Sequence, residues 1–321
     1  MCTAIHLLGK QGCYFGRNLD LEYCYHEQVT VTPRNYPVPL RNGRTMQQHY
    51  AMIGMATIID GYPLYYDATN EFGLSIAGLH FPENAAYLPK AADQDNIAPF
   101  ELILWLLGEC KTASQAWLKL QHMNLWNQPF SEQLPLSPLH WLVADDHTSF
   151  VIEPMADGLH LYENPFGILT NNPPFPYHLY NLANFQHLSP KQAENRFCKK
   201  TMQLFSNGMG AIGLPGDFSS PSRFVRTVFV KENSVFEGDD VSQFFHILSS
   251  VAMPRGSIQM PDGRLEITQY SSCCDMKRGI YYYTTYENQR ITAIRMNDLP
   301  LDANQLSSFP LRKTPDILYE N

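Results

Sequence analysis

The sequence predicts an α+β fold built mainly from antiparallel strands. Short apolar stretches of strand-forming composition recur along the chain, and turn residues separate them. Apolar residues at helical spacing are confined to a few segments, none of them in the first 90 residues. A parallel, doubly wound sheet would need a helix after nearly every strand, so we expect antiparallel hairpins with the helices grouped between them.

The individual elements follow from local patterns. Residues 3–8 and 13–19 are apolar runs around the turn sequence Gly9-Lys10-Gln11-Gly12, which predicts a hairpin. Further strands are expected at 28–33, 51–59, 72–81, 139–144, 149–153, 159–162, 168–170, 267–273, 279–286 and 291–296. Helices are expected at 99–107, which opens on a proline, and at 113–123, 191–205 and 241–253. No linker or repeat divides the chain, and we expect one domain over residues 2–321.

Composition restricts the class of protein. The 321 residues carry 31 acidic and 23 basic side chains, without the basic stripe that nucleic-acid proteins use to neutralise phosphates. No stretch reaches 18 apolar residues, and the first residues do not resemble a secretory signal, so we expect neither a membrane span nor export. Seven cysteines, an odd number, indicate reduced thiols in the cytoplasm.

No cofactor or metal site is expected. Residues 208–213 match G-x-G-x-x-G, but Leu214-Pro215-Gly216 follows, and a proline there prevents the helix that would bind a pyrophosphate. Asp145-Asp146-His147 is more typical of a polar turn than of a metal site, and no His-Glu-x-x-His motif occurs.

Cys2 is the first candidate for chemistry. Removal of Met1 would give it a free α-amine beside its thiol, and an α-amine has an ordinary pKa of about 7.7–8.0, close enough to neutrality to serve as a general base. The predicted hairpin brings Arg17 and Asp20 near Cys2. The guanidinium would favour the thiolate and the carboxylate would orient the amine. The alternative is a surface ion pair, and the position of the two residues, rather than composition, favours the functional interpretation.

Two further segments combine polar residues with rigid backbone. Asn171 and Asn172 end a predicted strand before two prolines, and an Asn side chain can donate a hydrogen bond to an oxyanion. Residues 213–224 read as a rigid polar loop that ends near Arg223. The first segment alone could equally be an ordinary strand-ending turn, and the second alone is more typical of a solvated loop.

Together these residues resemble the choloylglycine hydrolase family, which contains bile salt hydrolases and penicillin V acylases. The resemblance rests on the runs MCT, GRNLDLEY, NEFGLSIAGLHFP, LHWLV, GILTNNPPF, GLPGDFSSPSRF, FFHILSSVAMPRG, EITQYSSC and GIYYYTTYEN, in the family's order over residues 2–297. It implies the N-terminal nucleophile hydrolase fold, a four-layer αββα sandwich of two antiparallel sheets between helices.

The resemblance also implies site roles, taken residue by residue. Cys2 matches the nucleophile, Arg17 and Asp20 the pair beside it, Asn171 the oxyanion side chain and Arg223 a distal arginine. His80 stands where the family contributes a backbone N–H to the oxyanion hole, at a position that is usually Asn in bile salt hydrolases and Tyr in penicillin V acylases.

The acyl site is implied in the same way. Its predicted apolar walls are Leu19, Ile59, Tyr66, Phe130 and Leu134, with Tyr66 bulkier than expected. The loop Gly208-Met209-Gly210 matches one that is associated with accepting taurine conjugates.

The expected function is hydrolysis of glycine- or taurine-conjugated bile acids through a thioester of Cys2. Reversal of the thioester step with another amine would give N-acyl transfer. One alternative is the same chemistry on penicillin V or an N-acyl homoserine lactone, which His80 and Tyr66 favour. The other is a non-catalytic binding protein on this fold. The family implies a homotetramer.

Overall fold

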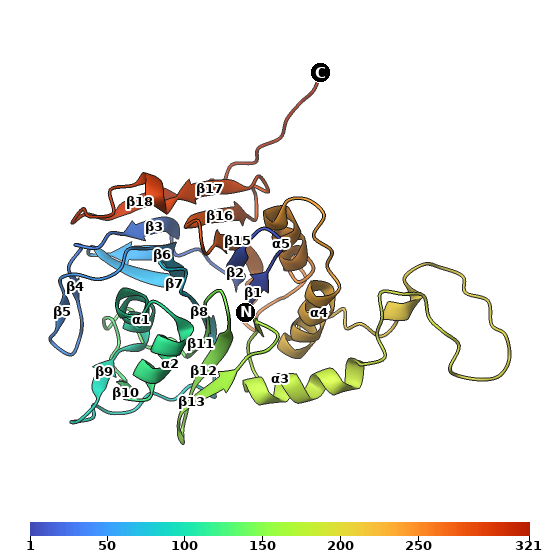
Figure 1. Cartoon of the computed structure of the whole chain (residues 1–321), viewed down its shortest axis with the longest axis horizontal. Coiled ribbons are helices and arrows are strands. Elements are labelled where there is room, and N and C mark those ends of the chain that lie inside the picture. The colour runs from blue at the N-terminus through green and yellow to red at the C-terminus, as the bar shows by residue number, and fades with distance from the viewer.

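The computed structural model describes all 321 residues and contains two large antiparallel sheets packed face to face (Figure 1). The six-stranded sheet has the order β14-β1-β2-β15-β16-β17, and the eight-stranded sheet has the order β13-β12-β11-β8-β7-β6-β3-β18. Every ladder in both sheets is antiparallel. The predicted α+β class is therefore confirmed.

The strands of the six-stranded sheet are β1 (Cys2–Leu8), β2 (Cys13–Leu21), β14 (Ile168–Leu169), β15 (Ile267–Asp275), β16 (Ile280–Thr285) and β17 (Thr292–Arg295). Those of the eight-stranded sheet are β3 (Gln28–Thr32), β6 (Met52–Ile59), β7 (Tyr62–Asn70), β8 (Ser75–His80), β11 (Leu139–Ala144), β12 (Ser149–Met155), β13 (Gly158–Glu163) and β18 (Ser307–Pro310). Two small pairs join β4 (Val38–Pro39) to β5 (Thr45–Met46) and β9 (Asp95–Ile97) to β10 (Met123–Leu125).

The helices are α1 (Leu102–Glu109), α2 (Ala113–Leu120), α3 (Phe175–Leu182), α4 (Ser220–Glu232) and α5 (Asp240–Ser249). Short 3-10 helices span Pro99–Glu101, Ala183–Phe185, Met209–Ala211 and Met296–Asp298. None of the helices is long and apolar enough to cross a membrane.

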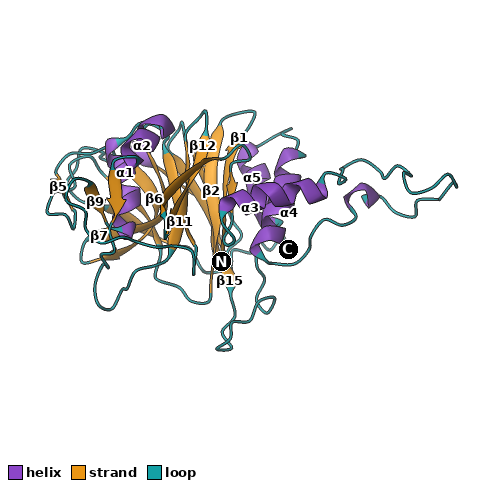
Figure 2. Ribbon diagram, turned by 90° about the horizontal axis from the view of Figure 1, so that it is seen from below, coloured by secondary structure: helices purple, strands orange, loops and turns teal.

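Helices cover both outer faces, which gives the four layers implied by the resemblance (Figure 2). Helices α1 and α2 bury their apolar residues on the eight-stranded sheet, in a cluster that includes Trp105 and Trp141. Helix α5 packs Phe244 against Tyr14 on the outer face of the six-stranded sheet. A third cluster, which contains Cys2 and Phe15, lies between the two sheets. The innermost layer therefore surrounds the chain's second residue.

Two expectations about helices were wrong. Residues 191–205 form no helix but an extended arm that projects from the body, because Phe197 and Phe205, 90% and 86% exposed, find no layer of this chain to pack against (Figure 1). Residues 213–224 are not a continuous loop, since α4 begins at Ser220 with Pro221 in its first turn, where a missing N–H costs nothing.

Each large sheet contains a β-bulge near the start of β1. Between β6 and β7, Met55 lies opposite Asp67 and Ala56 opposite Tyr65, so Tyr66 is an extra residue. Between β2 and β15, Asp20 lies opposite Thr268 and Leu19 opposite Tyr270, so Gln269 is extra. Bulges interrupt the regular pairing and re-aim side chains, and both of these lie beside Cys2.

Candidate active site

The thiol of Cys2 lies between the sheets, where Arg17 reaches it. The hairpin pairs Cys2 with Leu19 and Ala4 with Arg17, as the turn sequence predicts. Cys2 is 3% exposed, and Nη2 of the fully buried Arg17 donates to its Sγ over 2.5 Å. A guanidinium that donates directly to sulfur favours the thiolate form, the nucleophilic one.

Carbonyl oxygens hold the rest of the Arg17 guanidinium. Its Nη1 donates to Gly78 O and, over 3.2 Å, to Tyr66 O. The Tyr66 carbonyl is available because the bulge takes it out of the β6–β7 ladder. Burial acts to lower the pKa of Arg17, but the facing thiol, Tyr270 and Asp67 outweigh it and raise this pKa.

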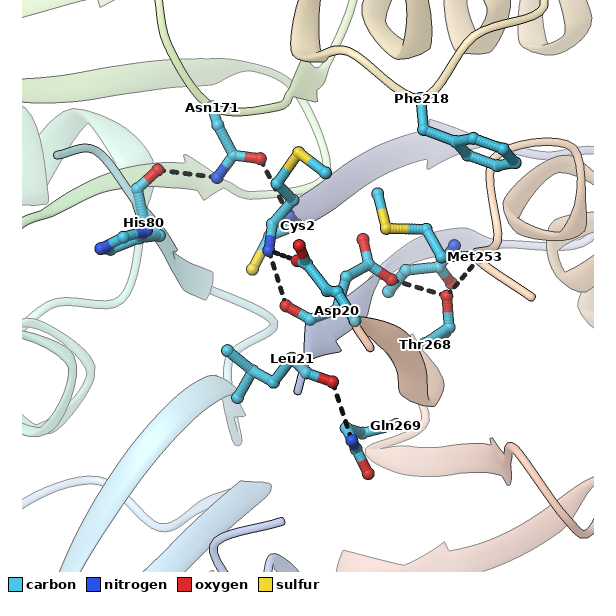
Figure 3. A network of polar contacts seen from close by, with 12 residues as sticks. Cys2, Asp20, Leu21, His80, Asn171, Phe218, Met253, Thr268 and Gln269 are labelled. Carbon is cyan, nitrogen blue, oxygen red and sulfur yellow. Dashed lines mark hydrogen bonds and ion pairs between the residues drawn. The ribbon is translucent and has the colours of Figure 1, made fainter. Parts of the chain in front are cut away.

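Asp20 lies beside the chain terminus (Figure 3). Its Oδ1 accepts from Thr268 Oγ1 over 2.6 Å, while its buried Oδ2 has no partner. The Met1 amine donates to the Asp20 carbonyl over 2.7 Å and pairs with Glu266. Burial raises the pKa of Asp20, against the positive α-amine, Arg223 and the Thr268 hydroxyl, which lower it. A free carboxylate oxygen next to an amine is suited to orienting that amine.

Asn171 lies two residues beyond the end of β14 and joins three elements (Figure 3). Its Oδ1 accepts from Cys2 N over 2.8 Å and from Arg223 Nη2 over 2.7 Å. Its Nδ2 donates to His80 O over 2.7 Å. An amide nitrogen carries two hydrogens, so one N–H of Asn171 is left to donate to a bound group.

The backbone of Asn171 is fixed from both sides. Its N–H donates to Ser220 Oγ over 2.8 Å, and its carbonyl accepts from His178 Nε2 over 2.9 Å. Burial lowers the pKa of His178 to about 4, which keeps this ring neutral near pH 7. The two contacts hold the side chain of Asn171 at one orientation.

His80 ends β8, and its backbone points toward Cys2. Along an antiparallel ladder, residue pairs that share hydrogen bonds alternate with pairs that share none. Phe81 N donates to Pro138 O, so the adjacent pair, His80 and Leu139, shares none. The N–H and C=O of His80 therefore both point away from β11. The C=O on that side accepts from Asn171. The His80 side chain is exposed at its outer edge. Burial of its inner side and the positive α-amine both lower its pKa.

Arg223 reaches the site from the first turn of α4. Its Nη1 donates to the Cys2 carbonyl and, over 2.6 Å, to Thr3 Oγ1, and its Nη2 donates to Asn171 Oδ1. Burial lowers the pKa of this guanidinium. Arg223 thus contacts the backbone of Cys2 and the side chain of Asn171, and not the thiol.

A largely apolar cavity of about 210 Å³ adjoins the charged group. Tyr66 and Gly78 line it and also accept from Arg17 through their carbonyls, so two residues of the cavity wall contact the guanidinium that holds the thiol. The predicted walls Ile59, Phe130 and Leu134 line it too. The remaining lining residues are Tyr25, Thr57, Leu64, Tyr65, Pro99, Phe100, Ile103, Pro135, Leu136, Ser137, Leu139 and Trp141.

Two predicted binding elements lie elsewhere. Leu19 is not a cavity wall but a buried residue opposite Cys2 in the layer between the sheets. Gly208, Met209 and Gly210 follow the arm along the chain, away from Cys2, and neither line the cavity nor bond any residue of the site. Within one chain, this loop is separate from the site.

Several residues at the site had no signal in the sequence. Glu266 and Asp67 are buried carboxyl groups that meet Met1 and the surroundings of Arg17 from strands distant in sequence. Thr268 and Ser220 act through single hydroxyl groups in otherwise ordinary segments. No group of three or more His, Cys, Asp or Glu side chains is arranged to hold a metal ion.

Comparisons with known proteins agree with this geometry. The model of the linear amide C–N hydrolases, choloylglycine hydrolase family, matches residues 2–309. The chain is 52% identical to a bile salt hydrolase/transferase of Lactiplantibacillus plantarum over 97% of both chains. It is 37% identical to a bile salt hydrolase/transferase of Clostridium perfringens over 100% of both.

Solved structures give the same result for the fold. A variant of the conjugated bile acid hydrolase from Clostridium perfringens superposes with a TM-score of 0.95 at 36% identity, covering 100% of both chains. A penicillin V acylase from Agrobacterium tumefaciens superposes with a TM-score of 0.75 at 18% identity, covering 96% of this chain and 90% of its own, and shares the fold.

Proposed function

The chain belongs to the choloylglycine hydrolase family of linear amide C–N hydrolases, and on that premise we propose that it hydrolyses conjugated bile acids with Cys2 as nucleophile. The observation that carries this proposal is the contact of Arg17 with the Cys2 thiol, since the same guanidinium also bonds two residues of the apolar cavity wall. A charged nucleophile next to apolar walls suits an amide whose acyl part is large and apolar.

The proposed first step is attack by the Cys2 sulfur on the amide carbonyl carbon. The carbonyl oxygen becomes an oxyanion, which accepts from the free Nδ2–H of Asn171 and from the N–H of His80. As the C–N bond breaks, the α-amine of Cys2 transfers a proton to the leaving nitrogen, giving a free amino acid and a thioester.

Water then attacks the thioester and gives up a proton to the α-amine, which releases the bile acid and restores the thiol. An amine in place of water would be acylated instead, and the relatives at 52% and 37% identity carry the name hydrolase/transferase. In this scheme Arg17 favours the thiolate, Asp20 orients the amine, and Arg223 steadies Asn171.

The mechanism requires removal of Met1. In the chain with Met1, the nitrogen of Cys2 is an amide that donates to Asn171, and the Met1 carbonyl accepts from Asp20 N over 3.0 Å. Removal leaves an amine at this place, near the unpartnered Oδ2 of Asp20. Intact mass spectrometry should show a chain that begins at Cys2.

The decisive assay measures free glycine and taurine released from glycocholate and taurocholate, with penicillin V in parallel. We expect rapid release from the bile salts. Turnover of penicillin V with no release from either bile salt would overturn the proposed substrate and direct attention to His80 and Tyr66. Turnover of none of the substrates by a chain that begins at Cys2 would support a binding protein.

We further propose a homotetrameric, cytoplasmic enzyme. The arm carries exposed Phe197 and Phe205, and α3, which precedes it in the chain, carries exposed Tyr180; exposed aromatic residues of this kind are suited to contact with another subunit. All seven cysteines are free, as in a reducing compartment. Light scattering should give four times the chain mass, and a Phe197→Ser, Phe205→Ser double variant should give a smaller particle.

A further inference from the structure

A buried carboxyl group, Asp67, is linked to Arg17 through the hydroxyl of Ser272 and has no part in the steps above. It is 2% exposed and accepts three hydroxyl hydrogen bonds. Tyr270 donates to Oδ1 over 2.8 Å, and Tyr281 and Ser272 donate to Oδ2 over 2.6 and 3.2 Å. The same Ser272 hydroxyl accepts from Arg17 N over 3.2 Å. Hydroxyl donors around a carboxyl group favour its charged form.

The bulge in β7 is what aims Asp67 at this place. Strand residues normally alternate between faces, and Tyr65 and Ala68 point outward into the cluster beneath α1 and α2. Tyr66 is the extra residue, so it and Asp67 both face the layer between the sheets, where Tyr66 bonds Arg17 and Asp67 meets β15 and β16. Two consecutive residues of β7 therefore face Arg17: Tyr66 accepts a hydrogen bond from its guanidinium, and Asp67 is linked to the Arg17 backbone through Ser272.

Arg17 otherwise has no neutralising carboxylate among its hydrogen bonds. Apart from the thiol, its side chain donates only to the carbonyls of Asn18, Tyr66 and Gly78. A buried cation without a counter-charge is strongly unfavourable. Asp20 is directed elsewhere, because the α-amine and Arg223 act on it more strongly than Arg17 does. Burial raises the pKa of Asp67, and Arg17 is the charged group that does most to lower it.

We propose that Asp67 is a positioning residue for the nucleophile, which acts through Arg17 by balancing the charge of its guanidinium. This inference rests on the proposed function, because it assumes that Cys2 is acylated. When the thiolate becomes a thioester, the C–N bonding electrons leave with the amine, which takes a proton from the α-amine, and the sulfur no longer carries a negative charge. Asp67 then remains as the counter-charge of Arg17, so the acyl-enzyme does not contain an unbalanced buried cation.

The proposal predicts an effect of known sign on Cys2. In Asp67→Asn, Arg17 loses its counter-charge and attracts the thiolate more strongly. The pH midpoint for alkylation of Cys2 by iodoacetamide, followed by mass spectrometry of the Cys2 peptide, should fall by about one unit. The kcat/KM for amide hydrolysis should fall at least about tenfold, since acylation now leaves Arg17 unbalanced.

A merely structural role for Asp67 gives a different pattern. It would reduce activity and thermal stability without moving the alkylation midpoint downward. A folded Asp67→Asn protein with an unchanged or raised midpoint therefore overturns the proposal. The other titratable groups that face Cys2 and Arg17 are the same in both proteins; they are the α-amine, Asp20, His80, Arg223, Glu266, Tyr270 and Tyr281.

Two further variants complete the test. Tyr270→Phe removes one donor from Asp67 and weakens its charged form, so the midpoint should fall by roughly half a unit. If Asp67→Asn does not fold, Tyr270→Phe becomes the test, and an unchanged alkylation midpoint in that variant overturns the proposal. Asp145→Asn is the matched control, since that buried carboxyl accepts from three backbone N–H groups beyond β11 and should lower stability without moving the midpoint.

The alkylation readout needs no substrate, so it separates this inference from the proposed function. If bile salts are not hydrolysed but the midpoint falls in Asp67→Asn, the substrate is wrong and Asp67 still balances Arg17. If bile salts are hydrolysed and the midpoint does not fall, the function stands and the inference about Asp67 is wrong.

Discussion

The charged centre around Cys2 and the apolar cavity beside it are built in different ways. The side chains of the centre lie on or next to paired strands, except Arg223, which lies on α4, and Arg17, Asp20 and Arg223 are fully buried. Part of the cavity wall, with half-buried Phe130 and Leu134, comes from the irregular segment between β10 and β11. Strand register therefore fixes the chemistry, while the fit of the acyl group depends on side chains that can change without altering a sheet.

The largest effect should separate the two regions completely. Cys2→Ala removes the nucleophile and should abolish turnover of taurocholate, while the cavity keeps its walls. Binding of taurocholate, measured by calorimetry, should stay within about threefold of that of the unaltered chain, because its apolar contacts are untouched. Residual turnover well above background would show that another group attacks the amide.

The next effect tests the oxyanion donor inside the charged centre. Asn171→Ala removes the free N–H and the acceptor of Cys2 N, and kcat should fall by about 100- to 1000-fold. KM for taurocholate should change little, since Asn171 does not line the cavity. A KM that rises while kcat is kept would instead make Asn171 a substrate-binding residue.

A smaller effect is expected from the cavity wall. Phe130 packs at 5.2 Å from Phe100 and 5.6 Å from Tyr62, measured between ring centroids. Phe130→Ala should lower kcat/KM for taurocholate roughly tenfold, mainly through KM, because burial of a ring is worth about 1.5–3 kcal/mol. Tyr66→Phe, which removes only the hydroxyl bonded to Thr57, is the milder control. A loss in Phe130→Ala that arises from kcat rather than KM would contradict the separation of chemistry from substrate fit.

The last prediction concerns stability in acid, which should depend on the centre. Burial lowers the pKa of His178, behind Asn171, to about 4, below its unfolded value of about 6.5. The unfolded chain therefore takes up this proton first, and stability is lost as the pH falls from about 6.5 toward 4, by up to about 3 kcal/mol.

His178→Gln retains a donor for the Asn171 carbonyl but does not titrate. Urea unfolding at pH 6.5 and pH 4.5 should show a smaller loss of unfolding free energy in this variant than in the unaltered chain. Equal losses in the two proteins would mean that other groups, such as His6, cause the acid sensitivity.

The sequence allowed the local part of the site to be predicted. Cys2, Arg17 and Asp20 share one hairpin, and a turn of Gly9 to Gly12 with regular alternation is enough to set their relative positions. Asn171 follows a short strand, as predicted. The four layers needed the family resemblance, because alternation alone does not say which faces of two sheets meet.

The missed parts depend on contacts that alternation cannot predict. Asp67 meets Tyr270 and Tyr281 across 203 and 214 positions of sequence, and its direction depends on a bulge. The arm has apolar residues at helical spacing but no surface of its own chain to cover, so the pattern predicted a helix that does not form.

The bulge at Tyr66 makes β7 sensitive to length. Substitution of this residue changes one wall of the cavity, but deletion would restore unbroken alternation along the strand. Either Asp67 would then turn away from Arg17, or Tyr65 would leave the cluster beneath α1 and α2. In a lineage of such enzymes, β7 can vary in side chains far more readily than in residue count, so insertions and deletions should accumulate in the loops around it.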